Sequence, residues 1–152
     1  MTPPGLEFFA TFSVQVGTHL EIGTTLEGHR RIVPITGGTV RGPRISGNIL
    51  PGGADFQVAQ APDLVLLEAN YAVQLDDGDR IYVTNRGVRS GLSSDMTAVA
   101  EGQPVDPRRL YFRCTPQVHA TSSTWAWLDR SIFVATGERH PDHVQLKVFR
   151  LT

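Results

Sequence analysis

Apolar and polar side chains alternate strictly along the N-terminal segment of the chain. The apolar positions expected on one face are Leu6, Phe8, Ala10, Phe12, Val14 and Val16, and the polar positions expected on the other are Glu7, Thr11, Ser13 and Gln15. A period of two is typical of a strand between two unlike environments, because successive side chains of a strand point to opposite faces. The pattern predicts that the chain begins with a strand that packs on a core.

Further strand-like runs follow at short intervals. They cover residues 30–35, ending at Gly37-Gly38; residues 39–50, broken by Gly42-Pro43 at a bend or bulge; and residues 110–115, 125–136 and 144–151, the last two joined by a turn at 137–143. Only residues 95–102 and 106–110 are expected to form helical turns. Seven or more strands with short turns predict a β-sandwich or a β-barrel. No repeat or linker divides the chain, so residues 1–152 are expected to form one all-β domain.

The strongest turn signal is the Asp77-Gly78 pair, since both residues tolerate the positive φ of a two-residue hairpin turn. The pairs expected from such a turn are Asp76 with Asp79, Val73 with Tyr82, and Asn70 with Asn85. One face is then expected to carry Val65, Leu67, Ala69, Tyr71, Val73, Tyr82 and Thr84, and the other Glu68, Asn70, Gln74, Ile81, Val83 and Asn85. This register gathers polar side chains on one face of the sheet, and the sequence leaves open which face points inward.

Composition narrows the class of protein. A chain of 152 residues has the size of one domain and can bury a core. Its net charge of −1 gives no electrostatic reason to expect a nucleic acid or an anionic membrane as partner. No run approaches the roughly 20 apolar residues of a membrane span, and the N-terminal segment lacks the basic residues of a secretory signal. The single cysteine, Cys114, excludes an internal disulfide and favours a buried thiol in a cytoplasmic protein.

Several segments, spread over nearly the whole chain, carry a specific pattern. They are Ile35-Thr36-Gly37-Gly38-Thr39-Val40-Arg41-Gly42-Pro43-Arg44-Ile45-Ser46-Gly47, Leu50-Pro51-Gly52-Gly53-Ala54-Asp55-Phe56-Gln57, Asp77-Gly78 leading to Ile81-Tyr82-Val83-Thr84-Asn85-Arg86-Gly87, Tyr111-Phe112-Arg113, and Trp127-Leu128-Asp129-Arg130 with Phe133-Val134. In this order they resemble the bacterial and fungal family called domain of unknown function 3237. The resemblance implies an antiparallel β-barrel of the calycin-like, up-and-down kind with a central pocket. It implies no activity, because the family is named for the absence of one.

Two positions depart from the pattern of that family. Val118-His119-Ala120 stands where many members have Phe-Glu-Thr, and Leu128-Asp129-Arg130 stands where they commonly have Leu-Asn-Arg. The first change replaces a carboxylate by an imidazole, and the second replaces an amide by a carboxylate. If the family shares a site there, its acid–base character differs in this protein.

Asp55 and His119 are the candidate proton-transfer groups. Asp55 follows a rigid segment with two glycines, which let the backbone come close to a ligand. Its alternative role is that of a turn aspartate that accepts backbone N–H bonds. The imidazole of His119 titrates near neutrality and can both accept and donate a proton. Its alternative role is that of a hydrogen-bonded structural histidine.

Arg113 and Tyr82 are the candidate groups for stabilising an enolate or phenolate oxygen. A guanidinium that points into a barrel must pair with a carboxylate or face a ligand. The alternative for Arg113 is therefore an internal salt bridge with Glu68 or Asp129. The candidate substrate-binding residues are Glu68, Asn70, Trp125, Trp127, Asp129 and Arg41, among which Trp125, Trp127 and Asp129 share a face if their segment is a strand.

No motif for a metal or an organic cofactor is present, and neither is expected. His140 and His143 flank a Pro-Asp turn, where exposure is the favoured interpretation. The chain has no His-Glu-x-x-His pattern, no Gly-x-Ser-x-Gly elbow, no P-loop and no dinucleotide fingerprint.

The sequence thus predicts a cofactor-independent acid–base enzyme of the isomerase, cyclase or lyase type. Its substrate would be a small hydrophobic molecule with a carbonyl or phenol group, bound inside the barrel. One alternative is a non-catalytic carrier of a small hydrophobic ligand, which gains if Asp55, His119 and Arg113 lie more than roughly ten ångströms apart. A second alternative is a hydrolase of a lactone or ester. Exposed strand edges would favour a homodimer.

Overall fold

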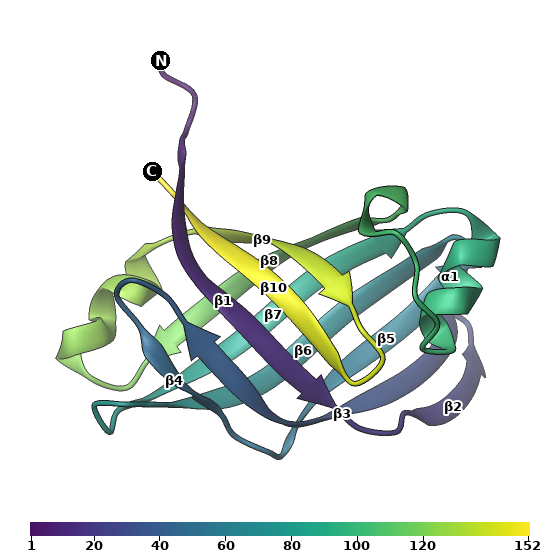
Figure 1. The fold of residues 1–152 in the computed structure, drawn as a ribbon, viewed down its shortest axis with the longest axis horizontal. Helices are drawn as coiled ribbons and strands as arrows, with labels where there is room; N and C mark the ends of the chain where they lie inside the picture. Colours follow the sequence, from purple (N-terminus) through teal and green to yellow (C-terminus); the bar gives the residue numbers. More distant parts are fainter.

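The strand that begins the chain closes the sheet. In the computed structural model, which describes residues 1–152, β1 (Leu6–Val16) pairs with β10 (His143–Leu151) on one side and with β3 (Gly28–Arg41) on the other. Between β3 and β10 the order around the sheet is β5 (Gly53–Ala61), β6 (Leu64–Leu75), β7 (Arg80–Ser90), β8 (Tyr111–Ala120) and β9 (Phe133–Arg139), all in antiparallel pairs. The predicted closed antiparallel β-barrel is confirmed (Figure 1).

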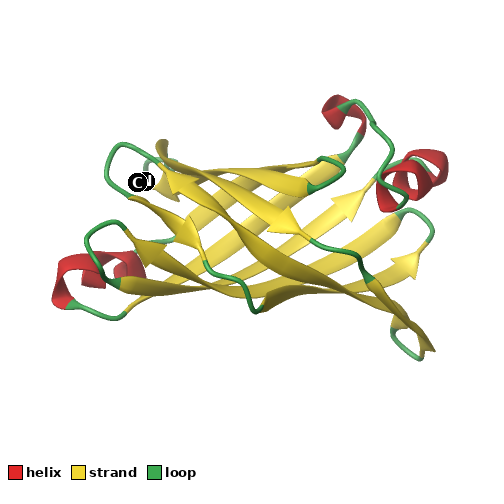
Figure 2. Ribbon diagram, turned by 60° about the horizontal axis from the view of Figure 1, so that its bottom comes forward, coloured by secondary structure: helices red, strands yellow, loops and turns green.

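The remaining elements lie at the two ends of the barrel. β2 (Leu20–Thr25) pairs with β3 near one end, and β4 (Ser46–Ile49) joins β3 to β6 near the other. The helix α1 (Ser93–Ala100) and the short 3₁₀ helix η1 (Pro107–Arg109) follow β7 and confirm the two helical turns expected there. A longer 3₁₀ helix, η2 (Ser123–Arg130), lies at the opposite end (Figure 2). None of these helices has the length and apolar character needed to cross a bilayer.

The interior of the barrel has an apolar part and a polar part. The largest fully buried side chains are all apolar: Phe12, Phe133, Ile81, Leu128, Val40, Val73, Val83 and Val148. Each fully buried side chain of this kind contributes about 1.5–3 kcal/mol to folding. Three buried polar side chains, Gln57, Asn85 and Arg89, interrupt this core. The apolar part stabilises the fold, which leaves the polar part available for another task.

The N-terminal strand does not keep its alternation throughout. A β-bulge between Phe8 and Ala10 turns Phe9 inward, where its ring packs 4.8 Å from that of Phe133. The expectation that Leu6 and Phe8 share the inner face is wrong, because the extra residue of a bulge reverses the side on which the preceding residues lie. Both side chains are exposed, at 60% and 42%. The inner face begins at Phe9.

The predicted register of the β6–β7 hairpin is also wrong, by one residue. Val73 pairs with Ile81 and Asn70 pairs with Thr84. The backbone N–H of Gly78 donates to the Leu75 carbonyl and Gly78 has φ +96°, so the loop is a type I turn followed by a glycine bulge. Because side chains alternate with period two, this shift exchanges the faces of one strand relative to the other. Glu68 and Asn70 now share the outer face with Thr84.

Two further strand predictions need correction. The segment 125–136 is not one strand, because η2 covers its first part and β9 begins only at Phe133. Trp125, Trp127 and Asp129 therefore do not share a strand face. In addition, β3 does not end at Gly37-Gly38 but continues through both glycines to Arg41. Neither β2 nor β5 was predicted from the alternation of side chains.

Gly38 lets β3 approach β1 closely, and its substitution is expected to be costly. A Cβ at this position would lie 2.0 Å from the Ser13 carbonyl oxygen, and the residue has φ +134°. Gly38→Ala is expected to lower the free energy of unfolding by about 2–4 kcal/mol. Gly52→Ala is the control, because Gly52 also has positive φ but nothing within 4 Å of its Cβ position. Urea denaturation of both variants measures the difference, and equal losses would show that the contact with Ser13 costs nothing.

Candidate functional site

Polar side chains meet on the inner face of the barrel near α1. On β5, Asp55 lies opposite Ala69 of β6, which in turn lies opposite Asn85 of β7. Directly opposite residues of an antiparallel pair share a face of the sheet, so Asp55 and Asn85 point to the same side. By alternation Gln57 lies on this face as well, and its burial together with that of Asn85 identifies the face as the interior.

These side chains line a small space, which we call the inner cavity. Its polar lining comprises Asp55, Gln57, Tyr71, Asn85, Arg89 and Arg139. The volume is about 40 Å³, which is room for about three water-sized groups, since one water needs roughly 10–15 Å³. A second space of about 150 Å³, the vestibule, adjoins it. Gln57 and Arg89 line both, and Met96 and Ala100 of α1 form part of the vestibule wall.

Many polar atoms around the inner cavity have no partner within the protein. They are Oδ1 of Asp55, the hydroxyl of Tyr71, Oδ1 of Asn85, Nε of Arg89 and, beside the vestibule, Nε of Arg31. A buried polar group without a hydrogen bond costs about 1–3 kcal/mol, and such groups are few in native proteins. Their concentration at one place makes this part of the interior the candidate site.

Asp55 is the only carboxylate that lines the inner cavity. It lies within a strand, so the alternative of a turn aspartate is wrong. Burial raises the pKa of Asp55, while a 2.9 Å hydrogen bond from Gln57 Nε2 and the charge of Arg89 act in the opposite direction. The net effect moves this carboxyl group toward the range in which a general base works well at neutral pH.

Arg89 and Tyr71 supply donors to the same space. Burial lowers the pKa of Arg89 to about 10, which leaves the guanidinium protonated at neutral pH. It lies 5.6 Å from the centre of the Phe112 ring. Burial raises the pKa of Tyr71, so its hydroxyl stays protonated and can donate a hydrogen bond. The inner cavity thus combines one base with two donors.

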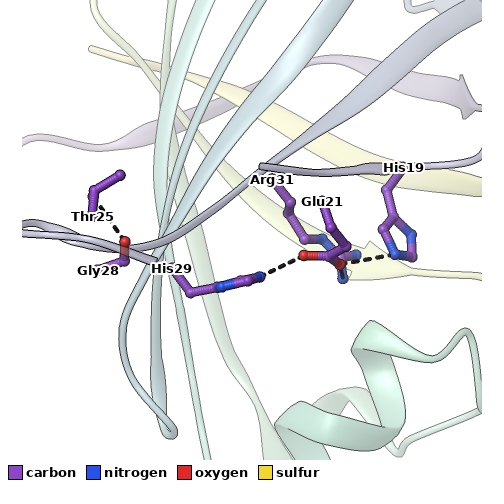
Figure 3. Close-up of polar contacts among 6 residues, drawn as sticks. All are labelled: His19, Glu21, Thr25, Gly28, His29 and Arg31. Carbon is purple, nitrogen blue, oxygen red and sulfur yellow. Dashed lines mark hydrogen bonds and ion pairs between the residues drawn. The ribbon is translucent and has the colours of Figure 1, made fainter. Parts of the chain in front are cut away.

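A charged cluster, which we call the rim, lies beside the vestibule and comprises His19, Glu21, His29 and Arg31 from β2, β3 and the residue before β2 (Figure 3). The Glu21 carboxylate lies 3.0 Å from His19 Nε2, 2.5 Å from His29 Nε2 and 3.7 Å from a terminal nitrogen of Arg31. The hydrogen bond from His29 lowers the pKa of Glu21. Glu21 is therefore an anion at neutral pH that holds Arg31 at the entrance of the barrel.

Of the four predicted catalytic residues, only Asp55 faces the interior. His119 and Tyr82 lie opposite each other on the outer face of β7 and β8, and both are about half exposed. His119 Nδ1 is 3.3 Å from Oδ1 of Asp129, whose Oδ2 accepts a 3.0 Å bond from the Ala120 N–H. This bond is the main cause that lowers the pKa of Asp129. His119 and Asp129 line a separate surface pocket of about 350 Å³ beside η2.

Arg113 also lies outside the barrel. It forms none of the predicted salt bridges but donates to the Phe112 carbonyl and lies 5.4 Å from the centre of the Tyr111 ring. Two of the predicted substrate-binding residues, Glu68 and Asn70, lie on the outer face as well. Glu68 pairs with Arg86 at 3.4 Å, and Asn70 accepts a bond from Thr84 at 3.1 Å.

The remaining predicted binding residues hold loops and helices in place. Trp125 Nε1 donates a 2.8 Å bond to Asp77, and the Arg44 guanidinium lies 4.3 Å from the centre of the Trp127 ring. Arg41 donates to the backbone carbonyls of Val40, at the end of β3, and Gly47, in β4. None of these side chains lines the inner cavity.

A groove of about 800 Å³ lies on the outer wall, lined mainly by strands β5 to β10. Phe56, Tyr111 and Phe149 contribute to its apolar floor. Four of its charged residues form the ion pairs Glu27–Arg30 and Glu68–Arg86, and no buried polar atom without a partner belongs to its wall. The groove is larger than the inner cavity, but the buried polar atoms without partners lie inside the barrel.

Six interior residues were not predicted as site residues from the sequence: Arg31, Gln57, Tyr71, Asn85, Arg89 and Arg139. Asn85 was placed in the hairpin, but with the wrong pairing partner. A usable signal was present in β7, where Ile81, Val83, Asn85 and Arg89 follow one face. Gln57 is likewise two residues after Asp55. No group of three or more histidine, cysteine, aspartate or glutamate residues is placed to hold a metal ion.

Comparisons with known proteins agree on the fold. The family model described as "Protein of unknown function (DUF3237)" matches residues 4–151. A UPF0311 protein of Rhodopseudomonas palustris is 39% identical over 152 residues, with 99% of both chains covered, and its crystal structure superposes with a TM-score of 0.96 over the full length of both chains. A β-barrel-like protein of Acinetobacter baumannii has 36% identity and a TM-score of 0.87, covering 100% of this chain and 98% of the other.

A more distant structure shares the fold. It is described as an enzyme from Penicillium herquei, and it superposes with a TM-score of 0.74 at 19% identity, covering 100% of this chain and 97% of the other.

The buried carboxylate makes a prediction about stability. A folded-state pKa above the unfolded value means that Asp55 lowers stability as the pH rises through that folded pKa. Asp55→Asn has no such titration, so its free energy of unfolding should exceed that of the wild type by about 1–3 kcal/mol at neutral pH, and the difference should vanish in acid. Glu68→Gln, on the outer face of the neighbouring strand, is the control. Urea denaturation across the pH range measures both, and a destabilised Asp55→Asn variant at neutral pH would contradict the assignment.

Cys114 is buried in the wall between the inner cavity and the outer groove, and its thiol provides a second test. Burial raises the pKa of its thiol to about 11. Since the thiolate is the reactive form, alkylation of the native protein by iodoacetamide should be slower than that of the urea-unfolded protein by at least roughly 10²-fold. Mass spectrometry follows the reaction, and similar rates would show that the thiol is accessible in the folded protein.

Proposed function

The chain belongs to the DUF3237 family of proteins of unknown function, and for this member we propose a cofactor-independent enzyme that moves a proton on a small carbonyl or phenolic substrate inside the barrel. The observation that carries the proposal is the set of buried polar atoms without partners around Asp55. A polar site lined by a largely apolar barrel lies in a low-dielectric environment, which strengthens electrostatic interactions with a bound substrate.

Asp55 is the general base of the proposed reaction. Its Oδ1 has no partner in the protein, while Oδ2 is held by Gln57. The fixed oxygen orients the carboxylate, and the free oxygen accepts the proton. The C–H bond next to a carbonyl breaks, its proton passes to Oδ1, and its electron pair moves to the carbonyl oxygen to give an enolate.

Tyr71 is the proposed donor to that oxygen. Its hydroxyl is buried, protonated and without an acceptor. A donor already placed where negative charge develops is worth several kcal/mol in a site without water. Return of the proton from Asp55 to another carbon completes an isomerisation, and loss of a leaving group from the enolate completes an elimination. A phenol would lose its O–H proton to Asp55 in the same way.

The proposed site differs from the one expected from the sequence in all residues but Asp55. His119, Arg113 and Tyr82 do not contribute, because they lie on the outer face. The Penicillium herquei protein, which shares the fold, is described as an enzyme, and this is compatible with chemistry inside such a barrel.

The second candidate is a carrier that binds a small molecule without changing it. It is favoured by one observation: Asp55, His119 and Arg113 do not converge on one space. The carrier and the enzyme share the inner cavity but differ in what Asp55 does there. Binding without proton transfer would support the carrier.

Exchange of substrate protons with solvent tests the enzyme without knowledge of the natural substrate. A panel of small ketones, keto acids and phenols in deuterated water is followed by proton NMR, with and without the protein. We expect deuterium incorporation next to a carbonyl, or at a ring carbon of a phenol, in at least one compound. Asp55→Asn should reduce that rate by about 10²-fold or more, and Tyr71→Phe should reduce it less.

Glu68→Gln is the matched control, since it removes a carboxylate from the outer face of the same wall. It should retain the full rate. Exchange that survives in Asp55→Asn, or that is absent from the whole panel, would count against the proposed enzyme.

A further inference from the structure

Arg89 is the most unusual charged residue of the protein. Only 3% of the residue is exposed, and Nε of its side chain has no hydrogen-bond partner. None of the ion pairs in the protein includes Arg89. A buried guanidinium without an opposite charge is strongly unfavourable. The folded protein therefore presents a cation that lacks its counter-ion.

The charges near Arg89 do not supply this counter-ion. Three arginines, Arg31, Arg89 and Arg139, line the inner cavity and the vestibule, and two carboxylates, Asp55 and Glu21, do the same. Glu21 is occupied by Arg31 and the two histidines of the rim. Asp55 forms no ion pair with any arginine, and its bond is with Gln57. With both acids ionised, one positive charge is left over.

Arg139 is already directed elsewhere. A terminal nitrogen of its guanidinium donates to the backbone carbonyls of His140 and His143, in the turn between β9 and β10. Arg89 has no such bonds and lines both cavities. An anion that enters through the vestibule thus meets Arg89 at the point where the two spaces join.

We propose that the ligand of this barrel is a small monocarboxylate whose carboxylate binds the guanidinium of Arg89. A guanidinium matches the two oxygens of a carboxylate with two parallel N–H···O bonds. The single surplus charge fits a monoanion better than a phosphate dianion, which would also face the carboxylate of Asp55. Together the two cavities remain below the roughly 300 Å³ of a drug-sized pocket, so the ligand is short.

The inference deepens the proposed function and rests on it for the second half of the substrate. With the carboxylate on Arg89, the rest of a short chain lies beside Asp55 and Tyr71, which line the same cavity. The substrate class is then a small oxo acid or phenolic acid. The carboxylate fixes the molecule, and the carbonyl or phenol group reacts.

Levulinate and levulinamide form a matched pair of probes, because they differ only in the charge of one end. Chemical-shift titration by NMR should give a dissociation constant on the order of 1 mM for levulinate. Levulinamide should bind at least about tenfold more weakly. Inorganic phosphate is the third probe, and it should not displace levulinate at equal concentration. Equal binding of acid and amide, or no binding of the acid, overturns the proposal.

Two variants locate the site. Arg89→Met should lose at least about tenfold in levulinate affinity and, without ligand, should unfold at a higher temperature than the wild type because it removes a buried unpaired charge. Arg86→Met, on the outer face of the same strand, should bind levulinate as the wild type does. If both variants bind equally well, Arg89 is not the site. Arg89→Lys, which keeps the charge but loses the two-pronged geometry, should show an intermediate affinity.

Asp55→Asn separates this inference from the proposed function. It should bind levulinate at least as tightly as the wild type, because it removes a like charge from the cavity, while it loses proton exchange. Selective levulinate binding without exchange in the wild type would retain the carboxylate site and reject the enzyme. Exchange on neutral ketones without any preference for levulinate would retain the enzyme and reject the carboxylate site.

Discussion

The burial of a cation and a carboxylate in one small space, without a direct ion pair between them, is the constraint on which the interior of this protein depends. Arg89 and Asp55 influence each other's protonation through their charges, yet each keeps atoms that have no partner. A barrel can hold such groups only because its strands satisfy their backbone hydrogen bonds around the whole circumference, which frees the interior side chains from that task. The site therefore needs closure of the sheet by β1.

The cost of these groups is offset elsewhere in the same barrel. The end next to η2 is filled by apolar side chains such as Phe12, Phe133 and Leu128, which are almost fully buried. The end next to α1 is packed less tightly, because it contains polar side chains and two cavities. Such an arrangement, in which a site is less stable than it could be, is common where function requires groups that the core would exclude.

The two departures from the family pattern fall outside this interior. His119 and Asp129 form a contact with each other at the junction of β8 and η2, where Asp129 also accepts the Ala120 N–H. Their chemistry is that of an exposed pair that anchors a helix to the sheet. The change of residue type at these positions consequently says little about the inner cavity, and the character of that cavity is set by Asp55, Tyr71 and Arg89.

Several features of this protein follow from the sequence by itself. Alternation along β1, β8 and β10, together with the density of turn residues, determined an all-β domain, and the resemblance to the family determined closure into a barrel. The segment with two glycines that precedes Asp55 was enough to predict Asp55 as a candidate site residue. These are local properties, because the period of two and the preference of glycine for turns act over a few residues.

The tertiary structure decided which side chains share the interior. A bulge at Phe9 and a three-residue loop at Gly78 each add one residue, and one residue is enough to move a whole set of side chains to the other face. That shift placed Asn85 and Arg89 inside and Glu68 and Asn70 outside. The cluster around Arg89 joins β3, β5, β6, β7 and β9, and its existence depends on long-range pairing that no local pattern encodes.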